Sequence, residues 1–278
     1  MISLFEYKKE VMERFKESGI DLDEINILFC ESLNCSKTDL LLKSNISLSE
    51  KSKIDRAVRK RLLGEPIQKI FNRAYFYGLV FYVNKNVLCP RPETELLVEE
   101  TLRFVGKNFT ILDLCTGSGV VAITLAKNSD AKITVSDISS KALDVARKNA
   151  YLNQVDVDFV KGNMFQNIYN KFDIIVSNPP YIPTEECDKL DVEVKDYDPR
   201  ISLDGGKDGL EFYRQIAIYA PYFLKKKGKL LVEVGINEAE NVKHLFEQSG
   251  FDCHIKKDYN NIERIVVGEL IWLKNATK

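Results

Sequence analysis

The spacing of apolar residues divides the chain into a helical N-terminal part and a longer part in which strands and helices alternate. Over residues 1–63 the apolar side chains recur at helical spacing, which predicts helices and no strand. Ser36 and Ser49 stand where the third and fourth helices are expected to begin, because a serine side chain can cap the first turn of a helix. Gly64 and Pro66 are expected to end the fourth helix.

From residue 110 onward, apolar runs typical of buried strands alternate with amphipathic stretches typical of helices. The predicted strands cover 110–114, 132–136, 156–160, 172–177, 229–234, 252–256 and 264–273, and the predicted helices cover 120–127, 140–151, 210–224 and 238–249. Such alternation implies parallel strands with right-handed crossovers and helices on both faces of one open sheet. The sequence therefore predicts an α/β fold.

An aromatic-rich stretch joins the two parts. Residues 74–83 carry several Tyr and Phe residues around Gly78, which predicts a hairpin or two short strands. We therefore expect a helical domain at 1–72, a β-hairpin linker at 73–90 and a sheet domain at 91–278.

Composition and charge restrict the classes of function. The 278 residues are 45% hydrophobic and 29% charged, as in an ordinary soluble globular protein. The net charge of −1 gives no global attraction to nucleic acid or to an anionic membrane. The N-terminal residues lack the pattern of a signal or transit peptide, and no apolar run has the length of a membrane helix. We therefore expect a cytoplasmic protein that binds neither nucleic acid nor membrane. We also expect a monomer.

The cysteines and histidines give no sign of a metal site. The six cysteines form no C-x-x-C pair, and His244 and His254 are the two histidines. Isolated reduced thiols are the better interpretation, so we expect no metal and no Ser/His/Asp machinery.

A basic run marks the fourth predicted helix. Its members are Lys51, Lys53, Arg56, Arg59, Lys60 and Arg61. Such a run usually forms a solvated helix face. The alternative is a docking surface for an acidic or nucleic-acid-associated partner.

The first strand after residue 110 ends in a glycine-containing loop that leads directly into a helix. Its residues are Asp113-Leu114-Cys115-Thr116-Gly117-Ser118-Gly119. Small residues let the backbone come close to a ligand, and the helix start supplies oriented N–H groups. About twenty residues later Asp137 ends the second strand, where its carboxylate can accept ribose hydroxyls. This spacing fits nucleotide-type cofactors generally.

A second polar segment, Asn178-Pro179-Pro180-Tyr181, follows the apolar strand at 172–177. The prolines have no backbone N–H, so neither a strand nor a helix continues through them. By itself this segment could be a loop corner. In an open α/β sheet, however, ligands bind at the carboxyl ends of the strands where the strand order reverses, so the glycine loop and Asn178 should face one crevice.

The tip formed by residues 178–181 suits a planar amide or aromatic amine. Such a nitrogen is a poor nucleophile, because its lone pair is delocalised. The Asn178 side-chain oxygen and the Pro179 carbonyl could accept its two N–H groups and favour positive charge on nitrogen as a C–N bond forms. The ring of Tyr181 could stack on the substrate or lie near a cationic methyl donor.

At this point the chain resembles a class I S-adenosylmethionine-dependent methyltransferase, and within that class the HemK/PrmC family of protein-(glutamine-N5) methyltransferases that modify release factors. The resemblance covers nearly the whole chain. It rests on Gly64-Glu65-Pro66, on residues 90–95 (PRPETE), on residues 113–119 and 178–183, and on residues 204–210 with Tyr213-Arg214. It implies a Rossmann-like sheet of seven strands with the last one antiparallel.

The resemblance also implies a substrate, a cofactor and their contacts. The substrate is the glutamine of the Gly-Gly-Gln loop in a class 1 peptide chain release factor, and the methyl donor is S-adenosyl-L-methionine. Contacts to the donor are expected from Cys115, Thr116, Gly117, Ser118, Gly119, Asp137, Met164 and Asn178. Substrate contacts are expected from Asn178, Pro179, Pro180 and Tyr181, of which Asn178, Pro179 and Tyr181 are the expected catalytic residues. Cys115 stands where the family often has glycine, and Asn163 and Met164 also depart from its common pattern.

Several other residues have two interpretations. Asp113 could brace the loop after its strand or lie beside the cofactor, and residues 92–95 could open a helix or form a wall of the pocket. Glu233 is expected to be structural or to act from behind the site. Gly205 and Gly206 are most simply a turn.

Four other functions fit part of the pattern. An N6-adenine nucleic-acid methyltransferase would use the same tip but would need to neutralise phosphates. A glutamine methyltransferase of a ribosomal protein would share the catalytic motifs. A non-catalytic scaffold or a nicotinamide dehydrogenase would have no evident use for Asn178 and the two prolines.

Overall fold

The computed structural model describes residues 1–271, which divide into two compact units. Unit 1 comprises Met1–Arg73 together with the short segment Val192–Tyr197, and unit 2 comprises Ala74–Asp191 and the chain from Asp198 onward. The predicted boundaries at 72 and 90 stay a prediction.

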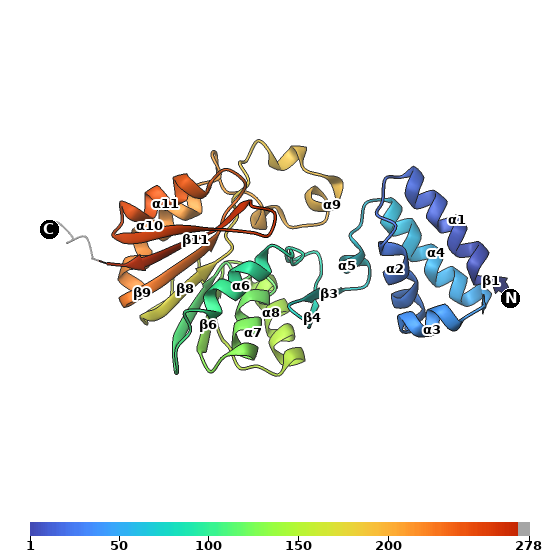
Figure 1. Cartoon of the computed structure of the whole chain (residues 1–278), viewed down its shortest axis with the longest axis horizontal. Helices are drawn as coiled ribbons and strands as arrows, with labels where there is room; N and C mark the ends of the chain where they lie inside the picture. The colour runs from blue at the N-terminus through green and yellow to red at the C-terminus, as the bar shows by residue number, and fades with distance from the viewer. Residues whose placement is uncertain (272–278) are drawn as a thin grey trace. The chain divides into compact units, whose positions relative to one another are not determined.

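Unit 1 is helical, as predicted (Figure 1). Its helices are α1 (Leu4–Glu17), α2 (Glu24–Leu33), α3 (Lys37–Leu42), α4 (Leu48–Leu62) and α5 (Ile67–Ile70), with α9 (Val192–Lys195) in the added segment. The apolar faces of α1, α2 and α4 meet in a core in which Phe15, Phe29 and Val58 are fully buried.

The expectation of helices alone was wrong in one detail, because two short strands pair in this unit. β1 (Ile2–Ser3) runs antiparallel to β2 (Asn45–Ile46). Ser3 and Ser47 are the N-caps of α1 and α4 and have extended backbone, so the segments that enter these two helices can share hydrogen bonds.

The N-termini of α3 and α4 test the helix starts that the sequence predicts at Ser36 and Ser49. Ser36 caps α3 through a reciprocal pair of hydrogen bonds with Asp39, which confirms the prediction. The start predicted at Ser49 was wrong, because Ser47 caps α4 and Glu50 returns a hydrogen bond to its backbone. The spacing Ser47-x-x-Glu50 matches a capping box, whereas Ser49 has no acid three residues later.

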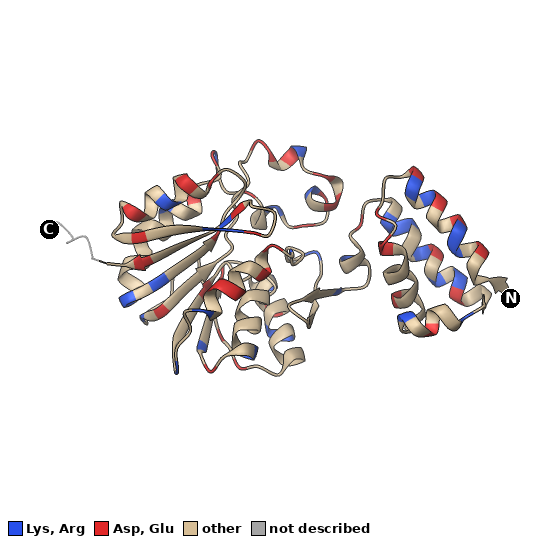
Figure 2. Ribbon diagram, viewed as in Figure 1, with Lys and Arg blue, Asp and Glu red and all other residues tan. Residues whose placement is uncertain are grey.

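The basic run on α4 does not form one continuous solvated face. Arg61 is only 3% exposed, and its guanidinium pairs with Glu24 of α2 at 2.5 Å and with Glu193 of the added segment at 2.5 Å. Gly64 lets the same segment come close, since a Cβ there would lie 2.6 Å from the Val192 side chain. Arg61 is therefore structural, while Figure 2 shows basic and acidic residues interspersed along α1 and α4.

Unit 2 is built on a seven-stranded sheet in the order β10-β11-β9-β8-β5-β6-β7. The strands are β5 (Thr110–Leu114), β6 (Lys132–Asp137), β7 (Asp158–Lys161), β8 (Phe172–Ser177), β9 (Leu224–Glu233), β10 (Phe251–Lys257) and β11 (Glu263–Leu270). β11 runs antiparallel to β9 and β10, and the pairings among β5 to β9 are parallel. The predicted Rossmann-like α/β sheet is confirmed, although residues 272 and 273 of its last predicted strand lie outside the described residues.

Helices cover both faces of this sheet (Figure 1). They are α6 (Thr94–Leu102), α7 (Val120–Asn128) and α8 (Ser140–Asn153) on one face and α10 (Glu211–Phe223) and α11 (Ala239–Glu247) on the other, with short 3-10 turns at Cys187–Lys189 and Arg200–Ser202. Side chains alternate between the two cores along each strand: Ile174 and Val176 of β8 face α6 to α8, whereas Ile175 faces α10 and α11.

The aromatic-rich stretch forms two short strands, as predicted. β3 (Arg73–Phe76) and β4 (Leu79–Tyr82) pair in a two-stranded sheet. Tyr77 and Gly78 both have positive φ, of 51° and 72°, which is the geometry of a tight type I′ hairpin turn.

Candidate active site

The glycine loop leaves β5 in left-handed backbone conformations. Gly117 and Gly119 have φ of 55° and 82°, and Gly119 stands at the N-terminus of α7. A side-chain hydrogen bond stabilises the loop, since the Thr116 hydroxyl donates to the Asp113 carboxylate at 2.6 Å. Burial raises the pKa of Asp113 to about 7. Asp113 therefore braces the loop and also lines the cavity described below.

Asp137, at the end of β6, ties the loop to the next strand. Its Oδ2 accepts the Gly117 N–H at 2.9 Å, and its Oδ1 accepts the Ser139 N–H at 2.8 Å. Burial raises the pKa of this carboxyl above its usual range. Each carboxylate oxygen can still accept a further hydrogen bond from a ligand.

Two sulfur-containing side chains lie together beside the loop. The Cys115 Sγ and Met164 Sδ are 3.7 Å apart, and both residues have positive φ, of 59° and 51°. Burial raises the pKa of the Cys115 thiol, so it stays protonated. Among residues 1–271 no cluster of His, Cys, Asp and Glu could hold a metal ion.

The acceptor side of the site begins where β8 ends. β8 pairs with β5, and the Ser177 hydroxyl donates to the Leu114 carbonyl at 2.8 Å, so the residues that follow both strands are neighbours. The Asn178 Nδ2 donates to the Thr94 Oγ1 at 3.2 Å. Asn178 and the glycine loop therefore meet at the switch point, as predicted from the strand order.

Residues 203–209 pack against the backbone of residues 181 and 182 and so support the tip. Gly205 donates its N–H to the Ile182 carbonyl, and Ile182 donates to the Leu203 carbonyl. A Cβ on Gly205 would lie 2.7 Å from the Tyr181 Cα, and one on Gly209 would lie 2.4 Å from the Tyr181 carbonyl oxygen. The glycines therefore permit a close backbone approach, which is more than the simple turn expected from the sequence.

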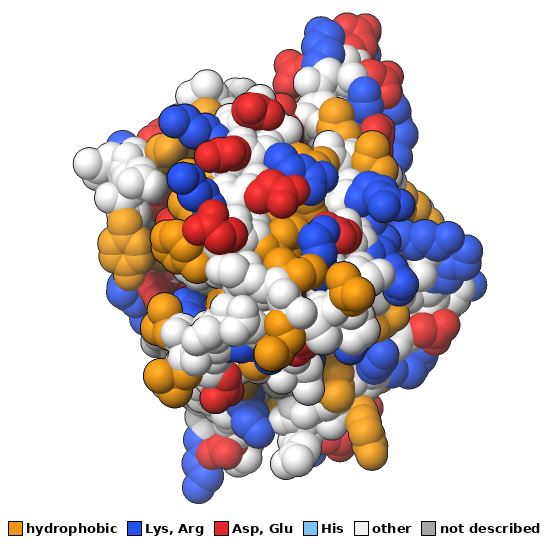
Figure 3. Space-filling view, turned by 90° about the vertical axis from the view of Figure 1, so that its right-hand side faces the viewer, with side chains coloured by type: hydrophobic (Ala, Val, Ile, Leu, Met, Phe, Trp, Pro, Cys, Tyr) orange, Lys and Arg blue, Asp and Glu red, His pale blue; other side chains and the backbone are white. Residues whose placement is uncertain are grey.

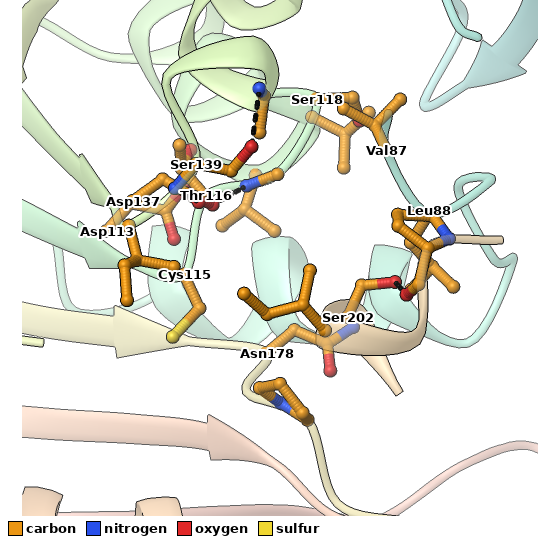
Figure 4. Close-up of a pocket in the computed structure, with 18 of the residues that line it drawn as sticks. Val87, Leu88, Asp113, Cys115, Thr116, Ser118, Asp137, Ser139, Asn178 and Ser202 are labelled. Atoms are coloured by element: carbon orange, nitrogen blue, oxygen red, sulfur yellow. Dashed lines mark hydrogen bonds between the residues drawn. The ribbon is translucent and has the colours of Figure 1, made fainter. Parts of the chain in front are cut away.

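The loop, Asp137 and Asn178 line one cavity of about 260 Å³. Figure 4 shows Asp137 and Thr116 on one side of it and Asn178 with Ser202 on another. The predicted site residues among its lining are Cys115, Thr116, Gly117, Ser118, Asp137, Met164, Asn178 and Pro180. Within the described chain, the lining leaves out Gly119, Pro179 and Tyr181, and Tyr181 is partly buried against the apolar core.

Sequence reasoning did not connect Thr94 and Glu233 with Asn178. Thr94 lines the cavity, while Glu233 is 3% exposed beside it and is not among the residues that line it. The one signal was an acid inside the apolar run of β9, because a carboxylate seldom occurs on a buried strand without a partner.

The fold and this cavity define the class: unit 2 is a class I S-adenosylmethionine-dependent methyltransferase domain. Residues 92–193 match the family model "Methyltransferase small domain", and residues 6–71 match "PrmC N-terminal domain". The chain belongs to the release factor glutamine methyltransferase family, since it is 34% identical to the "Release factor glutamine methyltransferase" of Bacillus anthracis over 96% of this chain and 99% of that protein.

A second relative supports this assignment, and a solved structure supports the fold. The protein of the same name from Geobacter sulfurreducens is 43% identical over 77% of this chain and 76% of its own length. A methyltransferase structure from Pyrococcus furiosus superposes with a TM-score of 0.56 at 21% identity, over 70% of this chain and 91% of that one, which supports the fold alone.

Proposed function

We propose that this chain transfers the methyl group of S-adenosyl-L-methionine to the side-chain amide nitrogen, N5, of the glutamine in the Gly-Gly-Gln motif of class 1 peptide chain release factors. The observation that carries the proposal is the place of Asn178, whose amide lines the same cavity as the glycine loop and Asp137. The choice of protein substrate is supported by the name of the relatives that match nearly the whole chain.

The residues of the cavity fit the methyl donor. Asp137 offers two oxygens with spare lone pairs for ribose hydroxyls, and Gly117 lets the backbone approach a ligand closely. The sulfur atoms of Cys115 and Met164 give a polarisable surface against which a planar base can pack. When bound, S-adenosylmethionine supplies the methyl group from its sulfonium. We extend these contacts to Thr116, Ser118, Gly119 and Asn178.

The acceptor amide is held by the tip of β8. The Asn178 Oδ1 and the Pro179 carbonyl accept the two N–H groups of the glutamine and direct its nitrogen lone pair. Both oxygens stabilise the positive charge that develops on nitrogen, and orientation alone can supply a large part of the rate. The methylated nitrogen is acidic and releases its proton to water. Pro180 and Tyr181 flank the substrate, with Tyr181 against its planar group.

We propose that residues 1–72 dock the release factor. This part has a core of its own, so it can present a rigid surface. Lys53, Arg56 and Arg59 are exposed on α4, and Leu41 and Leu42, the last two residues of α3, are 83% and 79% exposed. Figure 3 shows a face of the molecule on which basic, acidic and apolar side chains are mixed. Such mixed surfaces are typical of transient protein partners.

The proposal includes a monomeric enzyme that acts in the cytoplasm and binds neither nucleic acid nor membrane. The balance of 40 basic and 41 acidic residues supports the part about nucleic acid. No helix within residues 1–271 has the length and apolarity to cross a membrane. Light scattering of the purified chain, alone and with DNA, tests its mass and this lack of binding.

A labelling experiment tests the reaction. The protein is incubated with methyl-labelled S-adenosylmethionine and, in separate reactions, with a class 1 release factor, the same factor with the Gly-Gly-Gln glutamine changed to alanine, ribosomal protein, and DNA. We expect label in the intact release factor alone. Label that survives loss of the glutamine, or label only in ribosomal protein or DNA, would overturn the proposal.

A further inference from the structure

Asn178 lies next to two buried polar side chains, Thr94 and Glu233, to which the proposed reaction assigns no role. Thr94 begins α6 and Glu233 ends β9, and each is only 3% exposed. In the parallel pairing of β8 with β9, Ser177 lies opposite Val232. The next residues along the two strands, Asn178 and Glu233, are therefore neighbours.

The hydrogen bonds of this cluster have a direction. The Asn178 Nδ2 donates to the Thr94 Oγ1 at 3.2 Å, so its amide nitrogen is turned toward Thr94. The Glu233 Oε2 is buried and has no hydrogen-bond partner among the described residues. An ionised carboxylate only accepts hydrogen bonds, so it favours the donor end of a neighbouring amide over its acceptor end.

We propose that Thr94 and Glu233 are positioning residues that hold the Asn178 amide with its nitrogen away from the substrate and its Oδ1 toward the acceptor nitrogen. This inference rests on the proposed function, because the orientation matters only if Asn178 receives an N–H group. The two ends of an asparagine amide are nearly equal in size, so packing alone does not distinguish them. A flipped Asn178 would present an NH₂ group to the NH₂ group of glutamine and hold nothing.

The charge of Glu233 adds to this orientation. A negative carboxylate behind the amide polarises it and makes Oδ1 a stronger acceptor for a nitrogen that becomes positive. Burial raises the pKa of Glu233 to about 7, while the neighbouring Thr94 hydroxyl and Asn178 amide lower it. Glu93 raises this pKa further and Arg264 lowers it, while Tyr181 and Tyr213 also face the carboxyl.

Protonation of Glu233 therefore predicts a specific pH profile. The protonated acid can donate a hydrogen bond and hold the Asn178 oxygen instead of its nitrogen. Since the active form is the ionised one, turnover should rise with pH through about 7. Replacement by glutamine removes the titration and supplies a donor, so it should remove this inflection and lower turnover at every pH.

The test uses the 278-residue chain with three variants and two matched controls. Glu233→Gln and Thr94→Val remove the orienting groups, and Thr94→Ser keeps the hydroxyl. Glu100→Gln and Thr101→Val are the controls. Glu100 is also a buried glutamate, whose Oε2 is ion-paired with Arg103 and Lys256, and the buried Thr101 hydroxyl donates to the Leu97 carbonyl within α6. The assay is methylation of a class 1 release factor at saturating methyl donor, together with thermal melting and calorimetric binding of S-adenosylmethionine.

We expect kcat to fall roughly 10- to 100-fold in Glu233→Gln and Thr94→Val, with binding of the methyl donor unchanged. Thr94→Ser should recover most of the activity, and the controls should match the wild type. The inference would be overturned if Glu233→Gln and Thr94→Val kept the wild-type kcat, or if the pH inflection remained in Glu233→Gln. The proposed function would still stand in that case, because the wild type methylates the release factor. Loss of folding in both variants but not in the controls would make the cluster structural and overturn it as well. A wild type that never labels release factor would overturn the proposed function, and the inference with it.

Discussion

The cavity has two halves that are held in different ways. The cofactor half, Cys115–Gly119 with Asp137 and Met164, is shaped by backbone: Asp137 accepts the N–H groups of Gly117 and Ser139, and the loop has the left-handed turns that bring its amides close. The acceptor half, Thr94, Asn178 and Pro180 with Glu233 behind them, depends on a side-chain amide whose orientation is set by other side chains.

The two halves should therefore respond differently to mutation. A site formed by backbone tolerates changes of side chain so long as the turn survives, whereas a site formed by one amide depends on that amide and on its neighbours. In the proposed reaction, the cofactor half binds a ligand that is the same in every turnover. The acceptor half would stabilise a charge that exists only in the transition state, so its changes should appear in kcat.

The largest expected effect is that of Asn178→Ala. It removes the proposed acceptor of the substrate N–H but leaves the glycine loop and Asp137 intact. We expect kcat to fall by roughly 10²- to 10³-fold, as when one donor is removed from an oxyanion hole, with binding of S-adenosylmethionine kept within about threefold. Single-turnover methylation and titration calorimetry measure the two quantities. Lost cofactor binding together with a lost thermal transition would show that Asn178 is structural instead.

The two halves also differ in what the sequence could predict. The glycine loop and Asp137 were found from the sequence because one strand, one turn and one helix place them, all within 25 residues of each other. The strands themselves were predicted well: β5 and β8 have the predicted bounds, because buried β-branched runs between turn residues leave little choice.

The cluster behind Asn178 could not be found in this way. Thr94, Asn178 and Glu233 are 84 and 55 residues apart along the chain, and only the pairing of β8 with β9 and the packing of α6 bring them together. The same holds for Arg61, whose burial depends on Glu193, 132 residues further along. Periodicity describes one element at a time, so it does not show which distant side chain will neutralise a charge.

Asp137→Asn should give the next largest effect, in the cofactor half. The amide can accept at one of its two ends only, so either the Gly117 or the Ser139 N–H would face an NH₂ group. Loss of a charge-assisted hydrogen bond costs about 1.5–3 kcal/mol, so we expect the Kd for S-adenosylmethionine to rise roughly 10- to 100-fold. Turnover at saturating donor should change little.

Calorimetry and saturation kinetics separate these two quantities for Asp137→Asn. The control is Asp144→Asn in α8, whose carboxyl is exposed and paired with Arg147 at 3.0 Å. A fall in kcat at saturating donor without a change in Kd would contradict the assignment of Asp137 to the cofactor half.

Gly209→Ala tests how residues 203–209 support the tip at 178–181, and its expected effect is smaller. A methyl group there would lie 2.4 Å from the Tyr181 carbonyl oxygen, in a residue with φ of 77°. We expect a loss of about 1–3 kcal/mol in the free energy of unfolding and a lower kcat, because the tip at 178–181 must move. Gly78→Ala is a close match, with φ of 72° and no atom of the described chain within 4 Å.

Urea unfolding of the two glycine variants separates the causes. Gly78→Ala should show the backbone cost alone, about 1 kcal/mol, and wild-type kcat. Equal losses of stability and equal kcat in both variants would mean that the contact with Tyr181 has no influence on the tip.

The smallest effect is expected at Cys115, and it tests the backbone origin of the cofactor half most directly. Cys115 has φ of 59°, in the region that favours glycine. Cys115→Ala and Cys115→Gly both remove the contact of the thiol with Met164, but only glycine relieves the backbone strain. We therefore expect the glycine variant to be more stable than the alanine variant by about 0.5–1 kcal/mol.

Both Cys115 variants should bind S-adenosylmethionine within about threefold of the wild type, because the backbone of the loop would still make the contacts. Urea unfolding and calorimetry on the same samples give both numbers. A rise in Kd as large as that of Asp137→Asn would mean that the Cys115 side chain itself holds the cofactor. Both halves of the cavity would then depend on side chains. The expected order of mutational effects, largest at Asn178 and smallest at Cys115, would no longer follow from a contrast between backbone and side-chain contacts.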